Sequence, residues 1–266
     1  MLAMRTFYEE LEKRNSPPFP GLLVQEFYGA SSILVTATRS CIVSNMPIFM
    51  DRADAGRQLA AELSSYVRRN DVIVLALPRG GVPVAYEIAK TLHAPLDVFV
   101  VRKLGVPGHQ EVAMGAVATG GRCVVDEAVM RRAGVTPQQF QAVFAQEREE
   151  LKRREAAYRD DRPGPAVAGS TVIVVDDGLA TGASMYSAVA ALRRYEPAQV
   201  VVAIPVAPFE TCAWLRQVAD RVVCPNQLAY FGAVGFYYAN FAQVTDDEVR
   251  NLLSRAELER EQWKVA

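Results

Sequence analysis

The stretch VIVVDDGLATGAS, residues 172–184, combines side chains that could bind a phosphorylated sugar. Its four apolar residues predict a buried strand, and Asp176 and Asp177 follow at the carboxyl end, where ligands of open parallel sheets bind. Adjacent carboxylates would repel a lone phosphate, whereas they can accept hydrogen bonds from sugar hydroxyls. Burying both acids without partners would be costly, so we expect them to face a polar ligand.

The rest of this stretch has the composition of a phosphate-binding loop. Gly178 and Gly182 allow positive φ and close backbone approach, while Thr181 and Ser184 offer hydroxyl donors. A helix predicted from Ala183 would aim its first amides at the same point, which together with the acids suits ribose 5-phosphate. The predicted phosphate-binding residues are Gly178, Leu179, Ala180, Thr181, Gly182, Ala183 and Ser184. The alternative, an ordinary turn with a capping acid, leaves the paired acids, two glycines and two hydroxyls unexplained.

The elements that must position this stretch are those of an α/β protein. Residues 71–77, 81–92 and 95–103 have the patterns of a strand, a helix and a strand. The later part alternates in the same way, with strands predicted at 172–175, 199–207 and 221–225 and helices at 182–195 and 208–219. Continuously apolar strands are typical of parallel sheets covered on both faces. The sequence therefore predicts a doubly wound, mainly parallel sheet flanked by helices.

In these residues the sequence resembles the type I phosphoribosyltransferases. Their signature is an apolar strand, two acids, two variable residues, a small residue or Asp, then Thr-Gly and a small or hydroxylated residue, which residues 172–184 match throughout. The resemblance implies transfer of the 5-phosphoribosyl group of phosphoribosyl pyrophosphate to a nitrogenous base, within nucleotide metabolism. It also implies Mg²⁺ as cofactor, with Asp176 and Asp177 holding the ribose hydroxyls or the metal, directly or through water.

The resemblance assigns the leaving pyrophosphate to the loop LPRGGVP after the first strand. In the family a basic residue and glycine stand at this place, often after a cis peptide bond. Gly80 and Gly81 would expose amides to the pyrophosphate, and Arg79 would add charge. A surface salt bridge is the alternative role for the Arg79 side chain.

Residues 101–115, VRKLGVPGHQEVAMG, resemble the mobile loop that closes over the reacting sugar, in the form that adenine-type members have. Arg102 and Lys103 are candidates to stabilise the negative charge that develops on the leaving pyrophosphate. A solvated strand end is the alternative for both. Glu111 is a candidate general base toward the incoming nucleophile.

The acceptor base is constrained by one departure from the family. Where 6-oxopurine members have an Asp just before Thr-Gly, this chain has Ala180, which argues against hypoxanthine and guanine. Phe231, Phe236, Tyr237 and Tyr238 could stack on a base, with core packing as the alternative.

The resemblance also suggests a division of the chain. Residues 46–256 are predicted to form the phosphoribosyltransferase-like domain, with a helical insertion at about 127–168 that could be a lid or a dimer surface. Residues 1–45 are read as an N-terminal extension of unknown role and residues 257–266 as a C-terminal tail. Because related folds often dimerise, we expect a homodimer.

Composition excludes several other classes of function. The 29 Lys and Arg nearly balance the 30 Asp and Glu, so no overall field favours nucleic acid or a membrane. Four cysteines without C-x-x-C spacing and two histidines make a zinc site improbable. No apolar run approaches the roughly 20 residues of a membrane span, and no secretory signal is evident, so a cytoplasmic protein is expected.

Two alternatives to the transferase stay open. A regulatory module could bind phosphoribosyl pyrophosphate or a nucleotide without turnover, because a fold does not determine its function. Such a sensor would keep the phosphate loop but would not need Arg102 and Lys103. A hydrolase or phosphorylase could act on the same phosphosugar, with water or phosphate in place of the base.

Overall fold

The computed structural model of the chain describes residues 47–159 and 164–265, so the predicted extension 1–45 lies outside the described residues. The main sheet is built from β1 (Val72–Ala76), β2 (Leu96–Val98), β6 (Thr171–Val175), β7 (Gln199–Ala203) and β9 (Arg221–Val223). In the described part of the chain these five strands are parallel and lie in the order β2-β1-β6-β7-β9. The predicted parallel sheet is confirmed.

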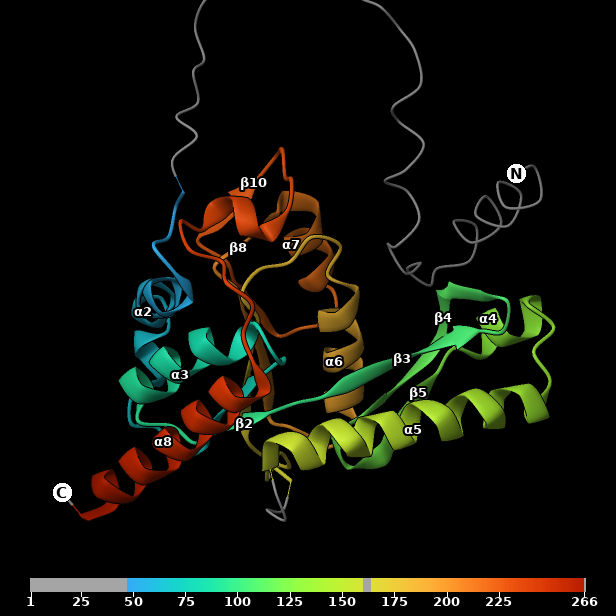
Figure 1. Cartoon of the computed structure of the whole chain (residues 1–266), viewed down its shortest axis with the longest axis horizontal. Helices are drawn as coiled ribbons and strands as arrows, with labels where there is room; N and C mark the ends of the chain where they lie inside the picture. Colours follow the sequence, from blue (N-terminus) through green and yellow to red (C-terminus); the bar gives the residue numbers. More distant parts are fainter. Residues whose placement is uncertain (1–46, 160–163, 266) are drawn as a thin grey trace, which may run out of the picture. The chain divides into compact units, whose positions relative to one another are not determined.

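Helices cover both faces of this sheet. They are α2 (Arg52–Ala61), α3 (Gly81–Leu92), α6 (Ala183–Arg193), α7 (Phe209–Leu215) and α8 (Asp246–Val265). Figure 1 shows α2, α3 and α8 on one side of the sheet and α6 and α7 on the other. The sheet is thus doubly wound, as expected, because consecutive residues of each apolar strand point to opposite faces.

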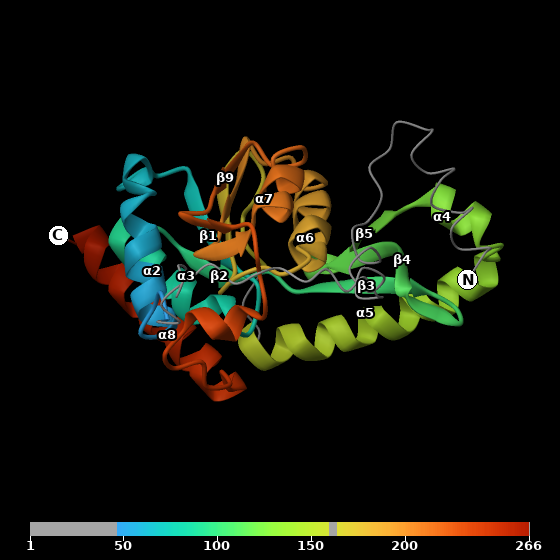
Figure 2. The same cartoon turned by 90° about the horizontal axis from the view of Figure 1, so that it is seen from above.

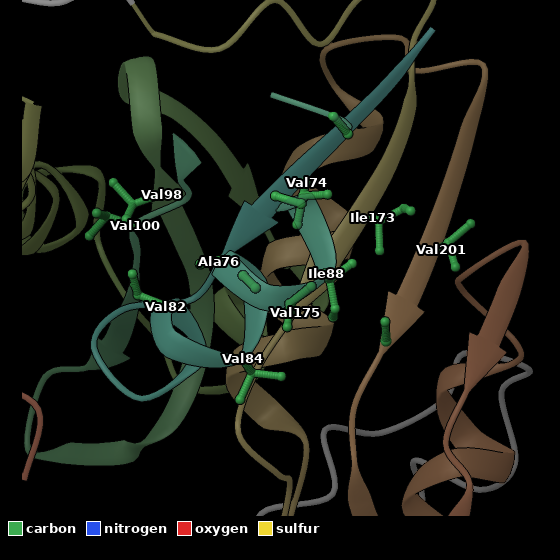
Figure 3. Packing of buried hydrophobic residues seen from close by; sticks show 14 of the residues in the cluster. Val74, Ala76, Val82, Val84, Ile88, Val98, Val100, Ile173, Val175 and Val201 are labelled. Carbon is green, nitrogen blue, oxygen red and sulfur yellow. The ribbon is translucent and has the colours of Figure 1, made fainter. Parts of the chain in front are cut away.

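Alternate strand residues define two hydrophobic cores. On one face Val74, Ile173 and Val201 pack side by side across β1, β6 and β7, and Ile88 of α3 lies near them (Figure 3). On the other face the intervening residues, such as Val174, pack with the buried side chains of α6 and α7. The central strands are buried on both faces, so the sheet is a rigid base for the loops at its ends.

A second, antiparallel sheet contains the segment predicted as a mobile loop. It is formed by β3 (Val101–Val106), β4 (His109–Ala118) and β5 (Arg122–Val125), in that order. The prediction of one strand at 95–103 was wrong, because the chain leaves the main sheet after Val98. The amide of Phe99 still bonds to the carbonyl of Ala76, whereas the carbonyl of Val100 already accepts from the amide of Thr119, the residue that follows β4 of the second sheet.

Two helices follow this sheet, α4 (Glu127–Arg132) and α5 (Pro137–Arg159). In two perpendicular views α5 runs alongside β3 and β4 (Figure 1, Figure 2). Its Leu151 and Tyr158 are buried in the core of the main domain. Arg159, also buried, bonds to Asp97 at 2.9 Å. The last turns of α5 are therefore anchored at the end of β2.

The C-terminal part differs from the sequence prediction in two places. The predicted strand 199–207 is divided into β7 and β8 (Val206–Pro208), and β8 pairs with β10 (Asn226–Leu228) in a small separate sheet. The assignment of 257–266 to a tail was wrong, since α8 continues through Val265 and Trp263 stacks on His93 of α3. None of the helices in the described residues is long and apolar enough to cross a bilayer.

Candidate functional site

The two loops predicted to bind pyrophosphate and ribose meet at the carboxyl ends of β1 and β6. These strands are paired up to Ala76 and Val175, so the loops that follow them start side by side. A Cβ on Gly80 would lie 2.1 Å from Oδ2 of Asp177, and one on Gly81 would lie 2.6 Å from the carbonyl oxygen of Val175. Only glycine permits this approach. The peptide bond between Pro78 and Arg79 is cis, as the family resemblance implied.

The predicted phosphate loop is held open by its own backbone and by α7. Gly182 has φ 71° at the N-cap of α6, a conformation that favours glycine. The hydroxyl of Thr211 donates to the carbonyl of Ala180 at 2.7 Å, which fixes the middle of the loop. Thr181 and Ser184 are exposed, and the first amides of a helix have no acceptor within it. The loop can therefore receive an anion.

The acid pair lies in a strongly desolvating environment. Burial raises the pKa of Asp176 well above its usual value, and the adjacent Asp177 raises it further. Burial also raises the pKa of Asp177, against the effect of Arg52. An oxygen of Asp176 accepts the amide of Asp177 at 2.9 Å. Two such acids gain most from a cation or from hydroxyl donors, which is the chemistry predicted for them.

Arg52, which the sequence reasoning did not single out, is the cation bound to this pair. Its Nε donates to Oδ2 of Asp177 at 2.7 Å, and its Nη1 donates to the carbonyl of Ala242 at 2.7 Å. Its guanidinium carbon lies 3.8 Å from the centre of the Phe241 ring. Arg52 and Asp177 are 125 residues apart, so no local pattern could have shown that the start of α2 faces the end of β6.

A cavity of about 380 Å³ opens at this junction. Its walls are formed by Arg52, Arg79, Gly80, Asp177, Phe241, Gln243 and Val244. The wall thus joins the predicted pyrophosphate loop and Asp177 of the acid pair to a third segment, 241–244, which the sequence reasoning missed. The cavity presents two guanidinium groups, a carboxylate, an aromatic ring and an amide, a set suited to a polar, phosphorylated ligand.

Comparison with known proteins agrees with this arrangement. The family model described as the phosphoribosyl transferase domain matches residues 48–240. The chain belongs to this family. The resemblance inferred from residues 172–184 is therefore confirmed.

Several known proteins are similar to this chain over most of its length. This phosphoribosyl transferase domain is 45% identical over 211 residues to two proteins of Mycobacterium tuberculosis, strains CDC 1551 and H37Rv, provisionally named phosphoribosyl transferases. The match covers 79% of the chain but 47% of each relative, so the chain spans about half the length of these proteins. The crystal structure of TT1426 from Thermus thermophilus is 42% identical, with a TM-score of 0.71, over 78% of this chain and 98% of that one.

Three of the predicted catalytic residues of the phosphoribosyl transferase domain, Arg102, Lys103 and Glu111, do not line the cavity, whereas Asp177 does. Arg102 lies on β3, and its Nη2 is 2.7 Å from a carboxylate oxygen of Glu147 on α5. Lys103, also on β3, is exposed. Glu111 is exposed on β4, with an oxygen 3.7 Å from Nδ1 of His109. Their catalytic roles stay predictions.

None of the four aromatic residues predicted for base stacking lines the cavity. Phe231 and Tyr237 pack on each other with ring centres 4.9 Å apart, whereas Phe236 is 76% exposed. Tyr238 is buried against Phe49, and its hydroxyl donates to the carbonyl of Asp177. Tyr238 thus contacts the backbone of the acid pair, and Phe241 is the aromatic ring in the cavity wall.

The donor set can be tested against the cofactor that the family implies. The described residues contain no cluster of three or more His, Cys, Asp or Glu side chains able to hold a metal. Asp176 and Asp177 supply two carboxylates at one place. Mg²⁺ in phosphate-transfer sites is commonly bound by one or two carboxylates together with substrate phosphates. The acid pair fits that mode, in which the substrate completes the metal site.

Proposed function

We propose that this phosphoribosyl transferase domain transfers the 5-phosphoribosyl group of phosphoribosyl pyrophosphate to a nitrogenous base and releases pyrophosphate. The observation that carries the proposal is the close approach of Gly80 to the Asp177 carboxylate, where an added Cβ would lie 2.1 Å from Oδ2. It brings a loop suited to pyrophosphate against acids suited to ribose hydroxyls. The two halves of one substrate would meet at that point.

Each predicted segment would hold one part of the substrate. Amides and hydroxyls of residues 178–184 would bind the 5-phosphate, and residues 79–81 would bind the pyrophosphate. Asp176 and Asp177 would accept hydrogen bonds from the ribose hydroxyls. The nitrogen of the base would attack C1 as the bond from C1 to the pyrophosphate oxygen breaks, with its electron pair leaving on that oxygen. Positioning would supply most of the catalysis.

Asp176 and Asp177 would also hold Mg²⁺, directly or through water. When bound, the ion would neutralise part of the charge on the pyrophosphate. Arg102 and Lys103 would add positive charge there once the hairpin approaches, and Arg102 would first have to leave Glu147. Glu111 would serve as general base from the same hairpin. The homodimer and the cytoplasmic location stay predictions.

A second candidate is a sensor that binds phosphoribosyl pyrophosphate without turnover. It is favoured by the position of Arg102, whose guanidinium is engaged by Glu147 on α5 rather than directed into the cavity. A hydrolase or phosphorylase on the same phosphosugar would share the site and differ only in its acceptor. Ala180, in place of the Asp of 6-oxopurine members, favours adenine or orotate over hypoxanthine and guanine.

Calorimetric titration of phosphoribosyl pyrophosphate with Mg²⁺ tests the proposal, followed by pyrophosphate release with adenine, hypoxanthine, guanine, orotate and uracil. We expect binding by the wild type, loss of binding in the double variant Asp176→Asn/Asp177→Asn, and release with one base. Asp247→Asn, on exposed Asp247 of α8, is the matched control. Binding without release would favour the sensor, release without a base would favour the hydrolase, and absence of binding would contradict all three.

A further inference from the structure

Arg52 connects the acid pair to the opposite wall of the cavity. Its guanidinium makes three contacts in three directions: with Asp177, with the carbonyl of Ala242 and with the face of the Phe241 ring. Its side chain is 11% exposed and that of Asp177 14%. A planar guanidinium can donate along fixed directions and stack on a ring at once, which a lysine ammonium cannot do. Arg52 is therefore held in one orientation by its own neighbours.

The contact with Arg52 fixes the rotation of the Asp177 carboxylate. Oδ2 is enclosed between Arg52 Nε, at 2.7 Å, and Gly80, where an added Cβ would lie 2.1 Å away. The carbonyl of Asp177 is bound by the hydroxyl of Tyr238, so backbone and side chain are both fixed. A carboxylate offers about four acceptor sites. The ion pair engages Oδ2, and Oδ1 is the carboxylate oxygen that it does not engage.

The position of Arg52, and with it that of the Asp177 carboxylate, depends on the packing of segments 49–50 and 238–240. Phe49 and Tyr238 form a β-bridge, and the amides of Ala239 and Asn240 bond to the carbonyls of Phe49 and Met50. Segments 49–50 and 238–240 therefore lie side by side, and they are followed along the chain by Arg52 and Phe241. The ion pair between Arg52 and Asp177 connects these two segments to the acid pair.

We propose that Arg52 is a positioning residue for the ribose, acting through Asp177. It holds Oδ2 so that Oδ1 faces the hydroxyls of the phosphosugar, and it does not itself contact the reacting atoms. The proposal rests on the proposed function, because it takes Asp177 as the group that binds the ribose. Without Mg²⁺, its effect is confined to ligands that contain the sugar.

Fragments of the substrate locate the effect. Calorimetry would compare ribose 5-phosphate and inorganic pyrophosphate without Mg²⁺, so that no metal links Asp177 to the pyrophosphate, and phosphoribosyl pyrophosphate with Mg²⁺. The proteins would be wild type, Arg52→Gln, Arg52→Lys, Asp177→Asn and the double variant Arg52→Gln/Asp177→Asn. The matched control is Arg57→Gln, since Arg57 lies on the same helix, is 56% exposed and is no closer than 3.7 Å to an acid. Melting temperatures would establish that each variant is folded.

We expect Arg52→Gln to weaken ribose 5-phosphate and phosphoribosyl pyrophosphate about tenfold, as residues in direct contact commonly couple by that amount. Pyrophosphate should change by less than about twofold. Arg52→Lys keeps the charge but not the planar geometry, so it should still weaken ribose 5-phosphate about threefold. In the Asp177→Asn background, Arg52→Gln should add less than about twofold, because the two residues act as one unit.

Several outcomes would overturn the role of Arg52. They are an Arg52→Gln variant that binds like Arg57→Gln, an equal loss for pyrophosphate, full rescue by lysine, or additive effects in the Asp177→Asn background. Failure of Arg52→Gln to fold would leave Arg52→Lys to decide. A wild type that binds neither ribose 5-phosphate nor phosphoribosyl pyrophosphate would instead contradict the proposed function itself.

Discussion

At the scale of single residues, the site depends on two glycines, which have no side chain, as much as on its charged residues. Gly80 and Gly81 let the loop after β1 touch the acids after β6 at distances that exclude any Cβ. The buried acids in turn need donors, and Arg52 supplies one of them. The closeness of these groups explains why a site for pyrophosphate and ribose can form between two short loops.

Gly80→Ala should disrupt the site without a change of charge. The new methyl would meet Oδ2 of Asp177 at 2.1 Å, so either the loop or the carboxylate must move. We expect at least about a tenfold loss of affinity for phosphoribosyl pyrophosphate with Mg²⁺, equivalent to about 1.4 kcal/mol. Calorimetry would measure it, with Gly164→Ala as control because an added Cβ there meets its nearest atom at 4.0 Å. Unchanged affinity would show that the contact does not matter for binding.

Residue types predicted part of this site and missed the rest for a physical reason. Asp176, Asp177 and Gly80 were predictable because their neighbours in sequence form one binding loop each. Arg52 and Phe241 belong to segments that meet the loops only after α2 and the chain beyond η3 (Val234–Tyr237) have packed together. Such contacts depend on tertiary packing, which spacing along the chain does not encode.

At the scale of elements, the β3–β4 hairpin shows why a loop was predicted in place of two strands. Glycines and a proline between Lys103 and His109 suggested a flexible loop, whereas in the structure Gly105 belongs to β3. A Cβ added to Gly105 would lie 2.8 Å from the carbonyl oxygen of Gln110, so the two backbones are in close contact there. The register shifts on either side of Gly105, as at a bulge. Glycine inside a strand often marks a bulge or a close approach of another backbone.

Arg102 on this hairpin can be tested separately from its ion pair. If Arg102 stabilises the leaving pyrophosphate, Arg102→Gln should lower the rate of pyrophosphate release at least about tenfold, which is typical for loss of one electrostatic contact in a transition state. Glu147→Gln breaks the same 2.7 Å ion pair but keeps the cation, so release should continue at the wild-type rate. Equal losses in both variants would assign the pair a structural role only.

Helix α7 is predicted to control the phosphate loop through Thr211. Thr211→Val keeps the shape of the side chain but removes the 2.7 Å hydrogen bond to the carbonyl of Ala180, a loss of about 1 kcal/mol. The loop should become less fixed, and affinity for ribose 5-phosphate should fall about fivefold. Thr211→Ser keeps the hydroxyl and should bind as the wild type does. A valine variant with wild-type affinity would mean that the loop is fixed by its glycines alone.

At the scale of the whole molecule, the two ends of α3 serve different purposes. Its first residue belongs to the predicted site, and its last turn packs against α8. Because β1 and β6 are central neighbours, their loops meet at the carboxyl edge, where α3 also begins at Gly81. The other end of α3 is covered by the last turns of α8, which the sequence reading had set apart as a tail. Those turns are rich in charged residues, so the sequence did not indicate that they pack against α3.

Removal of residues 257–266 should therefore destabilise the domain and leave its site intact. The truncation would remove the 2.7 Å bond from the buried Tyr86 hydroxyl to Glu259 and the stacking of Trp263 on His93, with rings 4.7 Å apart. Together these contribute about 2–4 kcal/mol, which corresponds to a melting temperature lower by roughly 4–16 °C for a domain of this size. Affinity for phosphoribosyl pyrophosphate, measured below the transition, should be unchanged.

Trp263→Ala is the control that separates the two contacts, because it removes the stacking on His93 and keeps the hydrogen bond between Tyr86 and Glu259. It should reproduce up to about half of the shift, since an aromatic pair contributes about 0.5–1.5 kcal/mol beyond the area it buries. A truncated chain that melts with the wild type would show that the last turns of α8 do not stabilise α3. A truncated chain that melts lower and also loses phosphoribosyl pyrophosphate would show that α3 transmits the disturbance along its length to Gly80 and Gly81.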